Sequence, residues 1–151
     1  MHVRAFSSAL RLMFVAIFFV SALACEGANR MDAEVRAKME DKLAKWNEEG
    51  FPIPDKAAIP NTIGNLKSWR FKYAKLFIVY DPQKAHPVDQ RAIVETIATE
   101  WWKTYPENMK PRFTLEVRGF DAIDDNENES GRTYVNKKGE IETHWYGTDV
   151  Y

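Results

Sequence analysis

HPVDQRAIVETIATEWWKTYP, residues 86–106, is the stretch that decides the fold, because its apolar residues recur with the period of an α-helix. Polar residues, among them Glu95 and Glu100, occupy the opposite side. Pro87 suits the first turn of a helix, and Pro106 ends it. The pattern predicts an amphipathic helix over residues 87–105, with an apolar face formed by Ile93, Val94, Ile97, Ala98, Trp101 and Tyr105.

Three residues of this stretch have predicted environments of their own. At 100° per residue, Trp101 falls near the middle of the apolar face, and we expect it in the core. Trp102 falls at the edge of that face and should be partly exposed. His86 directly precedes the helix, where a packing or capping role is favoured over the role of a catalytic base.

Strands are predicted on both sides of this helix. The run Leu76 to Tyr80 is continuously apolar and stops at Asp81-Pro82, which indicates a central strand buried on both faces. After the helix, Phe113, Leu115 and Val117 alternate with polar residues, as in a strand with one solvent-facing side. Strand, helix and strand in succession predict a right-handed crossover between two parallel strands.

The C-terminal segment GRTYVNKKGEIETHWY predicts a β-hairpin. Asn136 suits the first position of a type I turn, and Gly139 suits the left-handed position of a three-residue hairpin loop. Counting outward pairs Val135 with Ile141 and gives each strand face its own set of side chains. One face carries Val135, Ile141, Thr143 and Trp145, and the other carries Arg132, Tyr134, Glu142 and His144.

An amphipathic helix is also predicted at residues 31–49, because Met31, Val35, Met39, Leu43 and Trp46 form one stripe. Gly50 and Pro52 end it, and residues 51–65 form a connection rich in proline. The predicted class is α/β: an N-terminal helix followed by β-α-β-β-β, with a small mixed sheet in strand order 1-2-3-4 and helices mainly on one face. One domain is expected over residues 31–151.

Charge and motifs exclude several kinds of protein. The chain has a net charge of −1 and no basic stripe along its sequence, so nucleic acid is not an expected partner. The acidic segment DAIDDNENESG resembles a calcium loop, but Glu129 stands where the loop needs glycine and Val135 where it needs glutamate. Phosphate-binding glycine loops and catalytic serine, zinc or paired-cysteine motifs are absent from the sequence. We therefore expect no metal and no cofactor.

The first 24 residues have the features of a secretory signal, with Arg4 and Arg11 beside an apolar run and small residues at Ala22 and Ala24. Cleavage after Ala24 would make Cys25, the single cysteine, the first residue of the mature chain. This arrangement resembles the signal of bacterial lipoproteins, which implies a lipid on Cys25 and membrane attachment through residues 25–30, a short tether. Glu26 after the cysteine would suit the outer membrane, with the domain in the periplasm. Because Ala22 stands where such signals usually have leucine, ordinary cleavage to a soluble periplasmic or secreted protein stays open.

Two classes of function remain for this exported chain. The first is a binding or interaction module for a protein or small ligand, with Arg132, Tyr134 and Trp102 as candidate binding residues. The alternative is a small periplasmic hydrolase or transferase that uses His144 and Glu142 as an acid/base pair. Solvent-facing strands commonly carry such residues without chemistry, so the sequence favours the binding module.

Overall fold

The computed structural model describes residues 32–53, 62–81, 83–110, 114–123 and 126–146. The predicted signal peptide, Cys25 and the tether lie outside the described residues. The chain divides into two compact units, Met1–Arg36 and Ala37–Tyr151. In the first unit, the described residues begin a helix of residues 32–49, in which Arg36 pairs with Asp32 at 2.6 Å.

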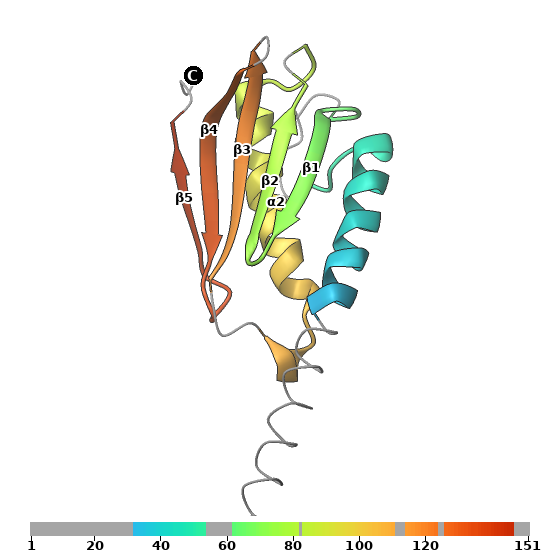
Figure 1. Ribbon diagram of the computed structural model, residues 1–151, viewed down its shortest axis with the longest axis vertical. Helices are drawn as coiled ribbons and strands as arrows, with labels where there is room; N and C mark the ends of the chain where they lie inside the picture. Colours follow the sequence, from blue (N-terminus) through green and yellow to red (C-terminus); the bar gives the residue numbers. More distant parts are fainter. Residues whose placement is uncertain (1–31, 54–61, 82, 111–113, 124–125, 147–151) are drawn as a thin grey trace, which may run out of the picture. The chain divides into compact units, whose positions relative to one another are not determined.

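The second unit is built on one mixed sheet of five strands, in the order β1-β2-β3-β4-β5 (Figure 1). The β2–β3 pair is parallel and the other three pairs are antiparallel. Helix α2 connects β2 to β3 and lies behind the sheet in Figure 1, so the predicted α/β class is confirmed. The bounds are β1 (Leu66–Lys72), β2 (Lys75–Tyr80), α2 (Pro87–Thr104), the short 3-10 helix η1 (Glu107–Met109), β3 (Leu115–Ile123), β4 (Asn126–Val135) and β5 (Ile141–Trp145).

The sheet is larger than predicted at two places. Strand β1 was not predicted, although Trp69 and Phe71 alternate with polar residues, because the connection before it is rich in proline and glycine. Phe71 contacts the ring of Trp101 edge-on at 5.3 Å, which fixes β1 against the helical side. The acidic segment after residue 120, for which the sequence predicts no strand, mostly continues β3 and β4 as a paired ladder. The backbones of β3 and β4 pair in this segment although its sequence lacks the alternation of apolar and polar residues that predicts a strand.

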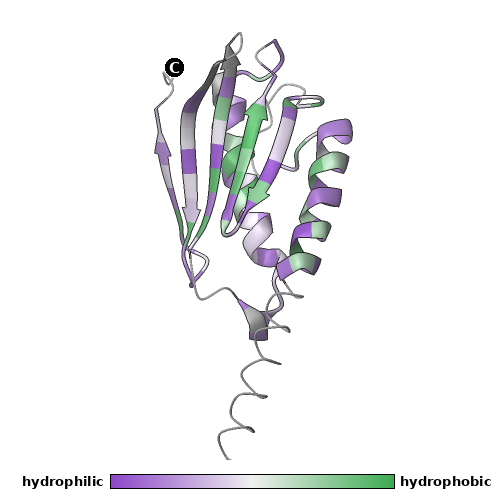
Figure 2. Ribbon diagram, in the orientation of Figure 1, coloured by the Kyte–Doolittle hydropathy of each residue, from purple (hydrophilic) through white to green (hydrophobic). Residues whose placement is uncertain are grey.

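The core lies between the sheet and α2. Trp101 has no exposed surface and Trp102 is half-buried, as predicted. The helix begins with His86 at its N-cap, where the side chain is exposed and makes no capping hydrogen bond with a described residue. Figure 2 shows β2 as the most hydrophobic strand, although Phe77 in it is only half-buried. The fully buried core side chains of the sheet and α2 include Leu76, Ile78, Ile93, Val94, Ile97, Leu115 and Val117.

A buried polar cluster joins the first turns of α2 to the parallel strands. The Tyr80 hydroxyl donates to the carbonyl oxygen of Gln90 at 3.0 Å, and the Gln90 side chain donates to Asp121 at 2.6 Å. Burial, and then the charge of Asp121, raise the pKa of Tyr80 well above its ordinary value. Gly119 of β3 lies beneath the Tyr80 ring, where a Cβ would stand 2.3 Å from the hydroxyl oxygen. Space for this tyrosine therefore requires glycine at position 119.

The helix of residues 37–49 packs on the same side as α2. Met39 and Leu43 are fully buried, and the Thr104 hydroxyl donates to the Met39 sulfur at 3.4 Å. Asn47 binds the edge strand through both side-chain atoms, accepting from the Leu66 amide at 2.9 Å and donating to its carbonyl at 3.0 Å. The helix ends at Gly50, which has a φ of 102°, as the sequence predicts.

The predicted C-terminal hairpin is confirmed. Val135 pairs with Ile141, the Gly139 amide donates to Asn136 at 2.9 Å, and Gly139 has a φ of 82°. The Trp102 ring packs so closely that a Cβ at position 139 would lie 2.9 Å from it. Gly139 is thus needed both for the turn and for the contact with α2.

Gly139→Val should destabilise the second unit by at least about 1 to 2 kcal/mol, the cost of a left-handed non-glycine residue, with the Trp102 contact adding to it. Chemical denaturation of both proteins measures the change. Gly139→Asn tolerates the backbone better but keeps the steric contact, so it should lose less, and Lys138→Val at the exposed neighbour serves as the control. Equal stability of Gly139→Val and wild type would show that the turn geometry is wrong.

Candidate functional site

The open face is the side of the sheet opposite α2, and no described helix covers it (Figure 1). Strand register aligns its side chains in rows that cross the strands. One row, the arginine row, runs from β1 to β5 through Arg70, Phe77, Arg118, Arg132 and His144. With strands about 4.8 Å apart, this row spans about 19 Å.

Two further rows flank the arginine row. The lysine row contains Lys72, Lys75, Glu116, Tyr134 and Glu142. On the other side, Ser68, Val79, Phe120 and Glu129 align across β1 to β4. The open face therefore combines cations, carboxylates and aromatic rings from all five strands, whereas the sequence singled out only the hairpin residues.

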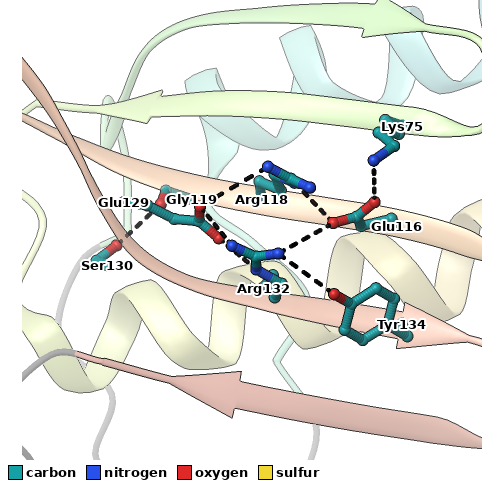
Figure 3. Close-up of polar contacts among 8 residues, drawn as sticks. All are labelled: Lys75, Glu116, Arg118, Gly119, Glu129, Ser130, Arg132 and Tyr134. Carbon is teal, nitrogen blue, oxygen red and sulfur yellow. Dashed lines mark hydrogen bonds and ion pairs between the residues drawn. The ribbon is translucent and has the colours of Figure 1, made fainter.

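Glu116 is the centre of this face (Figure 3). Its carboxylate accepts from Arg118 at 2.6 Å, contacts the Lys75 ammonium at 2.8 Å, and lies 3.8 Å from Arg132. Its side chain is only 8% exposed, although it belongs to the polar side of β3 that the alternation predicts to face solvent. Burial by itself would raise the pKa of Glu116, but the hydrogen bonds and charges of Lys75 and Arg118 outweigh it, and the pKa is lowered.

A β-bulge places Glu129 on the open face beside Arg132. Residues three apart on a regular strand point to opposite faces, but Gly119 pairs with Gly131 and Phe120 with Glu129, which leaves Ser130 as an extra residue. Glu129 then accepts two hydrogen bonds from Arg132, the longer at 2.8 Å. Hydrogen bonds to Tyr134 and Glu129 raise the pKa of Arg132, so this guanidinium stays charged.

Aromatic rings fill the spaces between these charges. Phe77 stacks on Phe120 with centroids 6.1 Å apart, and the guanidinium carbons of Arg70 and Arg118 lie 5.2 and 5.8 Å from the Phe77 centroid. Such cation–π contacts hold arginine side chains in defined positions while leaving their polar edges available.

The structure brings His144 and Glu142 together, as the alternative function requires. The His144 Nε2 atom lies 2.9 Å from a Glu142 oxygen, and the Tyr134 ring meets the imidazole edge-on at 5.7 Å. Both side chains are well exposed, at 49% and 74%. They border an open hollow of about 610 Å³ lined by Thr114, Tyr134, Asn136, Glu140, Ile141, Glu142 and His144.

Trp102, the third predicted binding residue, does not belong to the open face. It lies on α2, where the Lys110 ammonium sits 3.9 Å from its ring centroid and the hairpin packs against it. Arg132 and Tyr134 do lie together, and the Arg132 guanidinium donates to the Tyr134 hydroxyl at 3.4 Å.

Comparison of the chain with family models, with curated proteins and with solved structures found no match. The part of the chain that the structure describes contains no cluster of histidine, cysteine, aspartate or glutamate able to hold a metal ion. In the same residues, every helix is too short or too polar to cross a bilayer.

Glu116→Gln should lower the free energy of unfolding by about 1 to 3 kcal/mol at neutral pH, because three cations lose their shared buried carboxylate. The folded-state pKa of Glu116 is lowered, so its stabilisation is present above the unfolded-state pKa of about 4.3 and is lost as pH falls through the folded-state value. The difference between variant and wild type should therefore shrink in acid. Denaturation curves from neutral pH to about pH 3 measure it, with the exposed Glu142→Gln as the matched control. A constant difference across this range would contradict the assigned role of the charge.

Proposed function

We propose that this protein is an exported protein of the bacterial envelope, held to a membrane through a lipidated Cys25, that acts as a binding module through the open face of its sheet. The single observation that carries the binding role is the uncovered face itself, on which ion pairs and ring contacts already order arginine and aromatic side chains. Arginine and tyrosine are the residue types that most often dominate binding energy.

Preorganisation supports this use of the face. Arg132 is held by the two hydrogen bonds that it donates to Glu129, and Arg70 and Arg118 lie against Phe77. Side chains that are ordered before association lose less entropy on binding. Tyr134 and Tyr146 add partly exposed rings at the edge of the sheet formed by β4 and β5. The guanidinium carbon of Arg132 lies 5.6 Å from the centroid of the Tyr146 ring.

A hydrolase or transferase is the second candidate function, favoured by the 2.9 Å contact between His144 and Glu142 beside the hollow. The glutamate could orient the imidazole for proton transfer to a substrate seated there. Both side chains of the pair are exposed to water, however. An acid/base pair works best in a site that excludes water. The binding module therefore remains the first candidate.

The lipid anchor predicts how the protein divides between membrane and soluble fractions. Wild type should sediment with membranes, because several acyl chains on one terminus anchor a protein stably. Cys25→Ser should move to the soluble fraction, and Ser21→Ala, ahead of the proposed cleavage site, serves as the control. Intact-mass analysis of the exported protein measures the modification. An unmodified Cys25 in that measurement would reject the anchor and leave the soluble alternative.

Two substitutions on the open face separate binding from catalysis. If the face binds a partner, Tyr134→Ala should lower the affinity for a partner recovered from envelope extract by about tenfold or more. Tyr73→Ala in the β1–β2 turn should leave that affinity unchanged. If the protein is a hydrolase or transferase, His144→Ala should instead lower turnover by about 10² to 10⁴ without changing stability. Titration of the recovered partner with each variant measures the first effect. A partner whose affinity does not depend on Tyr134 or Arg132 would exclude the β4–β5 half of the open face as its site.

A further inference from the structure

The open face is electrically asymmetric. In the arginine and lysine rows, β1 and β2 contribute Arg70, Lys72 and Lys75 and no carboxylate. The acidic residues of the face all come from β3, β4 and β5. The β1–β2 half is therefore positive although the whole chain has a net charge of −1.

Two cations of the positive half differ from Lys75 in their contacts. Arg70 and Lys72 are exposed, and neither forms an ion pair with a carboxylate among the described residues, whereas Lys75 contacts Glu116. Arg70 is positioned instead by the Phe77 ring. An anionic group that arrives here meets two exposed cations without first breaking an ion pair.

An apolar strip lies directly beside these cations. Phe77 and Phe120 stack on one another and are both half-buried, and Val79 lies in the row of Phe120. A ligand for this half should thus present negative charge and apolar groups at the spacing of neighbouring strands, about 5 Å. An extended polypeptide that carries carboxylates and apolar side chains has this chemistry.

We infer that the β1–β2 half of the open face binds an acidic, partly apolar polypeptide segment of a partner protein. This inference rests on the proposed binding role of the face. The carboxylates of the segment meet Arg70 and Lys72, and its apolar side chains contact Phe77 and Phe120. Lys75 contributes to the positive field without leaving Glu116.

A second copy of the chain fits this half less well. Two open faces packed about a two-fold axis along the strands would place β1 over β5 of the other copy. On β3, β4 and β5 of that copy, Glu116 and Glu129 are already bound by arginines, and Glu142 contacts His144. Such a dimer offers few available carboxylates to Arg70 and Lys72, whereas an acidic segment brings its own.

The test uses purified Cys25→Ser protein, so that no lipid contributes, and three labelled peptides of about eight residues, long enough to cross the face. Pairs of leucines alternate with pairs of aspartates, serines or lysines in the three peptides, so that each side of the extended chain carries both kinds of residue. Fluorescence anisotropy should show the aspartate peptide binding about tenfold more tightly than the serine peptide, and added salt should weaken it.

Variants of β1 should change this preference. The double variant Arg70→Gln with Lys72→Gln should lower the affinity for the aspartate peptide about three- to tenfold, the usual scale of two exposed ion pairs. The double variant Lys137→Gln with Lys138→Gln removes the same charge from the exposed hairpin turn. It should change the affinity for the aspartate peptide less than about twofold. Arg70→Glu with Lys72→Glu should reverse the preference toward the lysine peptide, a gain that misfolding cannot produce.

Four outcomes would overturn the inference. The first is an aspartate peptide that binds no better than the serine peptide, and the second is a hairpin control that lowers its affinity equally. Sedimentation equilibrium could show a dimer that Arg70→Glu with Lys72→Glu dissociates, which would assign the half to a second copy. Binding to phosphatidylglycerol vesicles without peptide binding would assign it to a membrane surface. In each case, continued dependence of a recovered partner on Tyr134 would leave the proposed function standing.

Discussion

The parallel pairing of β2 with β3 is the constraint on which the rest of the structure depends. Parallel neighbours cannot be joined by a tight turn, so the chain must cross the sheet, and it does so through α2. The crossover buries one face beneath Trp101 and locks its start through Tyr80, Gln90 and Asp121. All helical cover described in the second unit lies on that side, and the other side of the strands is left to polar and aromatic residues.

The open face shows how a sheet can carry many charges without helical cover. Glu116 sits beneath Lys75, Arg118 and Arg132, so a nearly buried carboxylate is neutralised by cations from three strands. The same contacts order the arginines, whose side chains would otherwise lose considerable freedom on meeting a partner. Stability and the capacity to bind therefore come from one set of ion pairs in this domain.

Local patterns predicted the elements whose signals are contained within a short segment. Helix α2, the placement of Trp101 and Trp102, and the Gly139 turn follow from periodicity and turn chemistry. The hairpin face was correct for the same reason, because alternation across a tight turn fixes Arg132, Tyr134, Glu142 and His144 together. Strand β1 was missed because its alternating pattern is short and follows a connection rich in proline.

The remainder of the candidate site could not be predicted because it depends on register between distant strands. Arg70, Phe77 and Arg118 become neighbours only when β1, β2 and β3 align. The bulge at Ser130 has a consequence for how this domain can change in evolution. Deletion of Ser130 would remove the bulge and leave Glu129 two residues from Arg132, so both side chains would still point to the open face of a regular strand. The Glu129–Arg132 ion pair thus tolerates a one-residue shortening of β4 at the bulge, whereas straightening the strand at its present length would turn Glu129 to the opposite face.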